Sequence, residues 1–192
     1  MKIIQQAIGG VYLIQPQVHT DGRGYFVETF RQDLLQQAIG YPIHFCQDNE
    51  AHSEQGVLRG LHFQWPPYAQ SKLIRVIEGE ILDIAVDLRP NSPNFGQHHR
   101  QQLSAQNQQQ LYIPKGFAHG YLVLSSQAKI HYKVDAPYAP NHEGGLAYND
   151  PQLNINWRTE PQTQKQATLS EKDQNQPRLA DIRQQCQAFN AL

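Results

Sequence analysis

Short runs of apolar and β-branched residues, separated by turn sequences, recur through most of the chain and limit what it can fold into. The turns contain glycine, proline, asparagine and aspartate, as at 21–24, 78–80, 89–93 and 114–116. Many short strands with few helices between them are typical of a β-sandwich or β-barrel. We therefore predict an all-β fold. The expected strands are 11–14, 25–30, 57–64, 72–77, 81–88, 110–113, 117–124 and 128–134.

Two helices and one long loop are expected outside these strands. The first helix covers 32–39 and ends at Gly40, and the second runs from about Arg178 to the end of the chain. The segment 149–176 is polar and reads as a loop. No internal repeat or linker divides the sequence. We therefore predict one barrel domain over 1–192, with an extension over about 150–192.

The charge balance excludes several classes of protein. The 192 residues include 16 Lys and Arg and 17 Asp and Glu, so no basic field attracts nucleic acid or an anionic membrane. The apolar runs are too short to span a bilayer, and the N-terminus turns polar before a signal sequence could form. A cytoplasmic location is expected. Cys46 and Cys186 match no metal-site spacing, and we predict that both are free thiols.

Three segments carry polar residues where an ordinary barrel strand would not. His62 lies in 57–64, Lys72 begins 72–77, and His119 follows the turn at 114–116. Because side chains alternate along a strand, Leu58, Gly60, His62 and Gln64 should share one face. Arg59 should then face away from His62 unless Gly60 marks a bulge.

The spacing of these segments resembles the two motifs of the cupin barrel. Gly56 precedes His62 as in the first motif, and the second motif is matched by Pro114, Gly116 and His119. Metal-binding cupins have a second histidine where this chain has Gln64, and an acidic ligand where it has Lys72. The resemblance implies an antiparallel jelly-roll barrel.

The two departures favour chemistry without a metal or any other cofactor. An ammonium repels a divalent cation and cannot coordinate it while protonated. Lys72 can instead stabilise an oxyanion that develops on a carbonyl. His62 has an intrinsic pKa suited to a general base. Tyr132 shares the inward face of 128–134 with apolar residues and could donate a proton. We therefore predict proton transfer beside a ketone.

A wider set of motifs resembles the dTDP-4-dehydrorhamnose 3,5-epimerase family. The similarity runs from about residue 10 to residue 177, and the set is specific although no single motif is. The chain departs from the family pattern at His19, where phenylalanine is expected. The motifs are 21–28, 47–49, 56–64, 69–73, 83–89, 92–96, 113–120, 132–133, 149–151 and 169–173.

The resemblance implies a role for each matching residue. His62 would be the base, oriented by Asp173, Lys72 would steady the enolate oxygen at C4, and Tyr132 would return a proton to the opposite face. Asp83 would pair with His119. The residues implied to bind the nucleotide-sugar are Arg23, Glu28, Gln47, Asp48, Asn49, Arg59, Lys72, His119, Tyr138, Glu143 and Lys172.

The resemblance also implies a substrate, a reaction and an assembly. The substrate would be a dTDP-linked 4-keto-6-deoxyhexose, inverted at C3 and C5 on the route to dTDP-L-rhamnose. The family is dimeric, with strand exchange common near the N-terminus, so a homodimer is expected.

Three other functions stay open from the sequence. A metal-dependent cupin enzyme could use His62 and His119, and metal analysis would identify it. A 3- or 5-only epimerase, or a ketoisomerase, would differ in the deuterium incorporated at C3 and C5. A non-catalytic sugar-binding cupin would show no solvent exchange.

Overall fold

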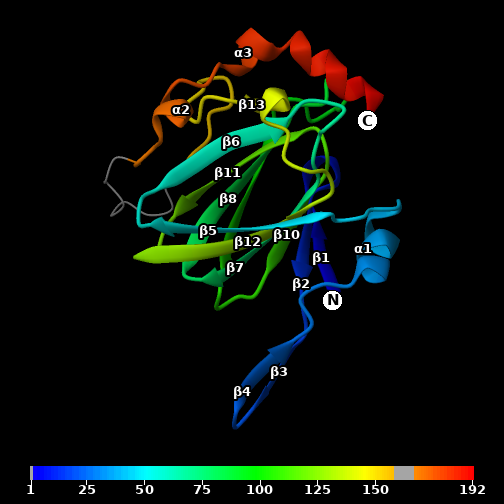
Figure 1. The fold of residues 1–192 in the computed structure, drawn as a ribbon, viewed down its shortest axis with the longest axis vertical. Helices are drawn as coiled ribbons and strands as arrows, with labels where there is room; N and C mark the ends of the chain where they lie inside the picture. The colour runs from blue at the N-terminus through cyan, green and yellow to red at the C-terminus, as the bar shows by residue number, and fades with distance from the viewer. Residues whose placement is uncertain (1, 158–166) are drawn as a thin grey trace.

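Two facing sheets form the body of the molecule (Figure 1). The computed structural model describes residues 2–157 and 167–192. Neighbouring strands within both sheets are antiparallel. The first sheet has the order β1 (Lys2–Gln6), β2 (Tyr12–Gln15), β10 (Gln110–Ile113), β7 (Lys72–Glu78), β12 (Gln127–Val134) and β5 (Gln47–Glu54). The second has the order β13 (Glu143–Gly145), β6 (Leu58–Gln64), β11 (Phe117–Val123), β8 (Glu80–Asp87) and β9 (His98–Ser104).

This arrangement confirms the predicted all-β, cupin-type fold with short helices. The predicted strand 25–30 is shorter, because β4 covers Gly24–Val27 and pairs with β3 (Val18–Asp21) as a separate hairpin. The sequence did not indicate β1, β3, β5, β9 or β13. All of these lie at a sheet edge or in the hairpin, where a strand has less apolar surface to bury.

The observed helices match the prediction for the first helix and differ from it at the C-terminus. Helix α1 (Gln32–Ile39) has the predicted bounds, and Gly40 ends it with a left-handed φ of 83°. The predicted C-terminal helix is wrong as one continuous element. It is divided into α3 (Leu179–Ile182) and the 3₁₀ helix η3 (Gln185–Ala191).

The segment predicted as a loop, 149–176, contains a short helix. This helix, α2 (Glu171–Gln174), begins at the N-cap Ser170. Residues 158–166 of the segment lie outside the described part. Two further 3₁₀ turns are η1 (Ile8–Gly10) and η2 (Pro140–His142). None of the helices in the described ranges has the length and apolar character needed to cross a membrane.

Apolar layers lie inside the barrel and on both of its outer sides. The interior holds residues from both sheets, including Ile74 and Ile81. The C-terminal helices cover the outer face of the second sheet, where Leu179 and Phe189 pack. Helix α1 covers part of the first sheet through Leu35. Because both faces of β8 and β11 are buried, their sequences are almost continuously apolar.

Candidate active site

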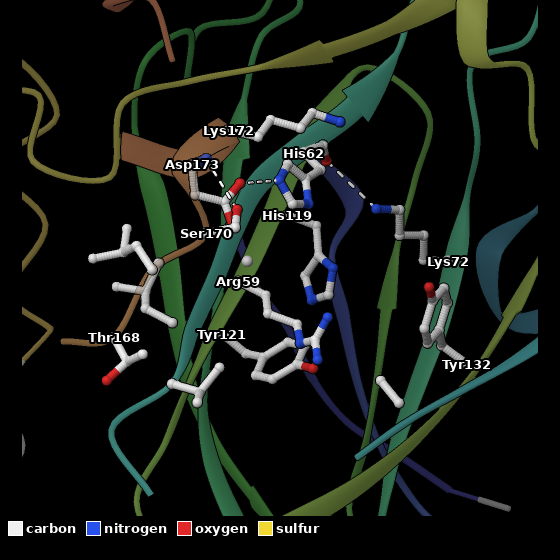
Figure 2. A pocket seen from close by; sticks show the side chains of 15 residues that line it. Arg59, His62, Lys72, His119, Tyr121, Tyr132, Thr168, Ser170, Lys172 and Asp173 are labelled. Atoms are coloured by element: carbon white, nitrogen blue, oxygen red, sulfur yellow. Dashed lines mark hydrogen bonds and ion pairs between the residues drawn. The ribbon is translucent and has the colours of Figure 1, made fainter. Parts of the chain in front are cut away.

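A cavity of about 410 Å³ opens where the interior of the barrel becomes polar (Figure 2). Strands of both sheets and the segment that leads into α2 form its wall. The segment is attached to the start of β6, because the Leu58 N–H donates to Thr168 O at 2.9 Å. The residues that line the cavity are Ala51, Val57, Leu58, Arg59, His62, Lys72, His119, Gly120, Tyr121, Tyr132, Thr168, Leu169, Ser170, Lys172 and Asp173.

His62 and Asp173 form a pair at the wall of this cavity. His62 Nε2 lies 2.5 Å from Asp173 Oδ1, and the Asp173 side chain is buried. Ser170 Oγ accepts the Asp173 N–H at 3.1 Å, so the cap of α2 fixes the residue that carries the carboxylate. A carboxylate at Nε2 favours the tautomer protonated there. The lone pair of neutral His62 then lies on Nδ1.

Burial decides the charge of His62 near neutral pH. Desolvation lowers the pKa of His62 below its ordinary 6.5, and the positive charges of Lys72 and Lys172 lower it further. The Asp173 carboxylate opposes this effect without reversing it. His62 is therefore mostly neutral at pH 7 and able to accept a proton.

Lys72 brings a buried amine to the same cavity. Lys72 is the first residue of β7 and is 9% exposed. Its Nζ donates to the backbone carbonyl of His62 at 3.4 Å. Burial lowers the pKa of Lys72 from 10.5 to about 8, while the charges of Asp83 and Glu143 act in the opposite direction. The amine is therefore still mostly protonated at pH 7, with little solvent around its charge.

Tyr132 reaches the cavity from β12, where it pairs with Ile74 of β7. Figure 2 shows its phenol on the side of Lys72, away from Asp173. Burial raises the pKa of Tyr132 above its ordinary 10, and the nearby charge of Arg59 only partly offsets the shift. The phenol therefore keeps its proton at neutral pH.

His119 and Asp83 form a second pair, as predicted. His119 Nε2 lies 2.9 Å from Asp83 Oδ2, and both side chains are buried. His119 also pairs with His62 across β11 and β6. The two imidazoles are therefore held on neighbouring strands of one sheet.

A bulge at Gly60 turns Arg59 into the cavity. Tyr121 pairs with Arg59 and His119 pairs with His62, so β6 has an extra residue over this stretch. Gly60 has a φ of 117°, and a Cβ there would lie 2.6 Å from the Cα of Gly120. Strict alternation fails as a result. Arg59 shares the inner face with His62, and Leu58, expected on that face, belongs to the outer core cluster.

A second cavity of about 280 Å³ shares His62, Lys72 and Tyr132 with the first. Gln47, Asn49, Tyr138 and Glu143 also line it.

A chain of polar contacts joins Tyr138 and Glu143 of the second cavity to Lys172 of the first. Glu143 Oε1 lies 2.6 Å from Lys172 Nζ, and the Tyr138 hydroxyl donates to Glu143 Oε2 at 3.1 Å. Burial alone would raise the pKa of Glu143, yet the contacts with Lys172 and Tyr138 hold it below its ordinary value. These contacts tie α2 to β13.

Three predicted binding residues lie apart from both cavities in this chain. Arg23 forms an ion pair with Asp21 at 2.6 Å on the β3–β4 hairpin, and its side chain is 91% exposed. Glu28 follows the hairpin and faces Arg31 at 3.9 Å. Asp48 points away from the neighbouring Gln47 and Asn49, and its Oδ1 accepts from Lys133 Nζ at 2.9 Å. His19 also lies on the hairpin.

Several cavity residues were not identified from the sequence. Tyr121 shares the inner face of β11 with His119, so alternation along that strand could have indicated it. Thr168, Leu169 and Ser170 belong to a polar segment with no periodic signal.

The two departures from the metal-binding cupin pattern have separate structural roles. Gln64 Nε2 donates to Tyr68 O at 2.7 Å and to Pro137 O at 3.1 Å, and its Oε1 accepts the Ala139 N–H at 2.8 Å. Its amide thus holds two loops together, while Lys72 faces the cavity. Within residues 2–157 and 167–192, no three His, Cys, Asp or Glu side chains are grouped to hold a metal ion. Cys46 and Cys186 are free thiols, as predicted.

Most of the chain is similar to known epimerases. A family model described as dTDP-4-dehydrorhamnose 3,5-epimerase matches residues 5–181. The dTDP-4-dehydrorhamnose 3,5-epimerase of Escherichia coli K12 is 48% identical over 85% of this chain and 86% of its own.

Solved structures extend the similarity to three dimensions. The Legionella pneumophila dTDP-6-deoxy-D-glucose-3,5-epimerase, solved with dTDP-4-keto-L-rhamnose, has a TM-score of 0.90 and 41% identity over 96% of both chains. A 3'-monoepimerase from Streptomyces bikiniensis, solved with dTDP-quinovose, has a TM-score of 0.86 and 31% identity, over 96% of this chain and 94% of its own. With this barrel, these cavity residues and these relatives, the chain belongs to the dTDP-4-dehydrorhamnose 3,5-epimerase family.

Proposed function

We propose that this protein is a dTDP-4-dehydrorhamnose 3,5-epimerase that inverts C3 and C5 of dTDP-4-dehydro-6-deoxy-D-glucose on the route to dTDP-L-rhamnose. One observation carries the proposal. In a chain of this family, a neutral imidazole, a buried ammonium and a protonated phenol line the same cavity.

The proposed reaction uses these three groups in turn. A ketone at C4 acidifies the C–H bonds at C3 and C5. His62 Nδ1 takes the proton, and the C–H electron pair moves to the C4 oxygen as an enolate. Lys72 stabilises that oxygen by charge and hydrogen bonding, which is worth about 10²–10³-fold. The enolate then collapses as the Tyr132 hydroxyl gives its proton to the opposite face of the carbon.

The cycle closes without a net change in oxidation state. His62 returns its proton to solvent and the Tyr132 phenolate regains one, so no electron donor or acceptor is consumed. Each acid or base contributes roughly 10²–10⁴-fold. The same groups act at C3 and C5.

The remaining polar residues would hold the nucleotide part of the substrate. Arg59 and Lys172 bring positive charge to the cavity, which suits a diphosphate, and His119 adds an imidazole that can form hydrogen bonds. Tyr138 is 56% exposed at the rim, where its ring can stack on a base. Gln47 and Asn49 add amide donors and acceptors.

The deciding experiment follows hydrogen exchange in heavy water. Given dTDP-4-keto-6-deoxyglucose, the protein should incorporate deuterium at C3 and C5 by ¹H NMR. His62→Ala should abolish exchange. Tyr132→Phe should retain exchange but lose most inversion, because the base is intact and the acid on the opposite face is gone. Normal turnover by His62→Ala would contradict the mechanism.

A second candidate function is epimerisation at C3 alone. The likeness to the 3'-monoepimerase of Streptomyces bikiniensis supports it. The same NMR experiment separates the two, because a 3-epimerase would exchange deuterium at C3 and leave the C5 proton in place.

We also propose a homodimer in the cytoplasm. Tyr25 and Phe26 are 61% and 70% exposed on the β3–β4 hairpin, which projects from the barrel (Figure 1). Two such aromatic residues on a projecting hairpin suit contact with a second copy. The free thiols suit a reducing compartment.

A further inference from the structure

Arg59 divides its donors between the barrel wall and the cavity. A guanidinium has five N–H donors. The Nε group donates to Ser53 Oγ at 3.0 Å, and Nη2 donates to the His52 carbonyl at 3.3 Å. The third nitrogen, Nη1, takes part in neither of these hydrogen bonds. The Arg59 side chain lines the cavity (Figure 2).

Arg59 differs from the other cations of the cavity in its charge balance. Lys172 is paired with Glu143, and Lys72 is buried beside His62. In the described ranges, no carboxylate lies within ion-pair distance of Arg59. Its charge is therefore available to an anionic ligand.

Ser53 connects three strands through one hydroxyl. The residue is 4% exposed on β5 and pairs there with Ala128 of β12. Its Oγ accepts from Arg59 of β6 and lies 3.5 Å from the hydroxyl of Tyr121 of β11. A contact at Nε restricts rotation of the guanidinium plane, so Ser53 determines where the remaining Nη donors point.

We propose that Ser53 is a positioning residue for nucleotide-sugar binding. It holds the guanidinium plane of Arg59 so that its Nη edge meets the diphosphate of the substrate. The inference rests on the proposed function, because that function supplies the diphosphate. Ser53 itself touches no substrate and acts through Arg59.

The first test measures dTDP binding by calorimetry with the full-length protein. Ser53→Ala removes the acceptor of Nε, and the loss of a hydrogen bond to a charged group should weaken dTDP about tenfold. The kcat should change by less than about threefold, because Arg59 is not a proton carrier in the mechanism. Ser104→Ala is a matched control. Ser104 is also buried, but its Oγ accepts from Asn107 N on a distant turn, so dTDP affinity should stay unchanged.

A double-mutant cycle then separates positioning from a general effect on the fold. In an Arg59→Met background, Ser53→Ala should cause no further loss of dTDP affinity. Equal losses in both backgrounds, or wild-type affinity in Ser53→Ala, would overturn the inference. The inference would also be overturned if the wild-type protein did not bind dTDP. If the wild type binds dTDP but exchanges no protons of the sugar, the proposed function fails while the Ser53 result stands.

Discussion

At the residue scale, burial in one cavity leaves His62 and Lys72 in different charge states. It lowers the pKa of His62 and of Lys72, because both groups lose hydration in their charged forms. The starting values differ, 6.5 for His62 and 10.5 for Lys72. The same effect therefore leaves His62 neutral and Lys72 protonated near pH 7, as the proposed mechanism requires.

This pair of charge states predicts a bell-shaped dependence of kcat/KM on pH. Activity should rise as His62 loses its proton below pH 6.5 and fall as Lys72 loses its proton near pH 8. Initial rates between pH 5 and pH 10 test this. Lys72→Arg is the control, because an arginine stays charged and should remove the alkaline limb. A wild-type rate that stays constant to pH 10 would show that Lys72 is not the group responsible.

The buried charge of Lys72 should also lower stability. Its pKa falls from 10.5 to about 8, so folding opposes its protonation by about 3 kcal/mol at pH 7. Lys72→Met should therefore raise the free energy of unfolding by about 1–3 kcal/mol while abolishing turnover. Urea denaturation measures the difference.

The pH dependence of the difference in unfolding free energy between the wild type and Lys72→Met tests whether the buried charge causes it. Between pH 8 and pH 10.5 the unfolded state binds more protons than the folded state, so wild-type stability gains from Lys72 as pH rises. The amount by which the unfolding free energy of Lys72→Met exceeds that of the wild type should therefore decrease over this pH range. If the difference in unfolding free energy does not change with pH, packing rather than the charge of Lys72 is its cause.

The sequence indicated the placement of some of these residues but not all of them. Motif spacing predicted that His62 lines the pocket, and alternation predicted that Tyr132 faces inward, because Tyr132 lies on regular strand. The position of Arg59 required the bulge, whose effect depends on the close approach of Gly120, a long-range contact. Ser53 and Tyr121 are ordinary strand residues in the sequence, and only the assembled barrel brings them to Arg59.

At the element scale, α2 is a very short helix that orients His62, the proposed base, through Asp173. A four-residue helix has little stability of its own, so its N-cap matters more than in a long helix. Ser170 supplies that cap, and Lys172 ties the helix to Glu143.

Removing the cap should therefore affect the rate more than the stability. Ser170→Ala should lower the free energy of unfolding by about 1 kcal/mol and reduce kcat roughly tenfold, because Asp173 no longer holds His62 at a fixed angle. Ser170→Thr retains a hydroxyl and should restore most of the rate. In an Asp173→Asn background, Ser170→Ala should have little further effect on kcat. A full second loss in that background would indicate that Ser170 acts elsewhere in the cavity.

The elements were predicted well where a strand is buried on both faces and poorly where it lies at an edge. Strand β10 has the predicted bounds, because all four of its residues are buried. Strands β5 and β9 consist mostly of polar residues, yet β5 supplies Ser53 and Asn49 to the site. Edge strands pair through their backbone, so their side chains carry little signal of the strand itself.

At the scale of the whole molecule, the β3–β4 hairpin separates Arg23 from the site that it is expected to serve. Arg23 lies on the projecting hairpin and outside both cavities of its own chain. A symmetric dimer in which each hairpin reaches the partner's cavity would resolve this, because a two-fold axis makes both exchanges equivalent. Light scattering should then give the mass of a dimer in solution.

A complementation experiment tests the exchange directly. Arg23→Ala and His62→Ala homodimers should both have little activity. Coexpressed and purified by two tags, their hybrid would contain one complete site, formed by the intact His62 of one subunit and the intact Arg23 of the other. Its activity should be about half that of the wild-type dimer. The control pairs a wild-type subunit with an Arg23→Ala/His62→Ala subunit and carries the same two substitutions in total. If hairpins are exchanged, neither of its sites is complete and activity should be lost. If each hairpin serves its own chain, the results reverse, and the control keeps half of the activity while the hybrid loses it.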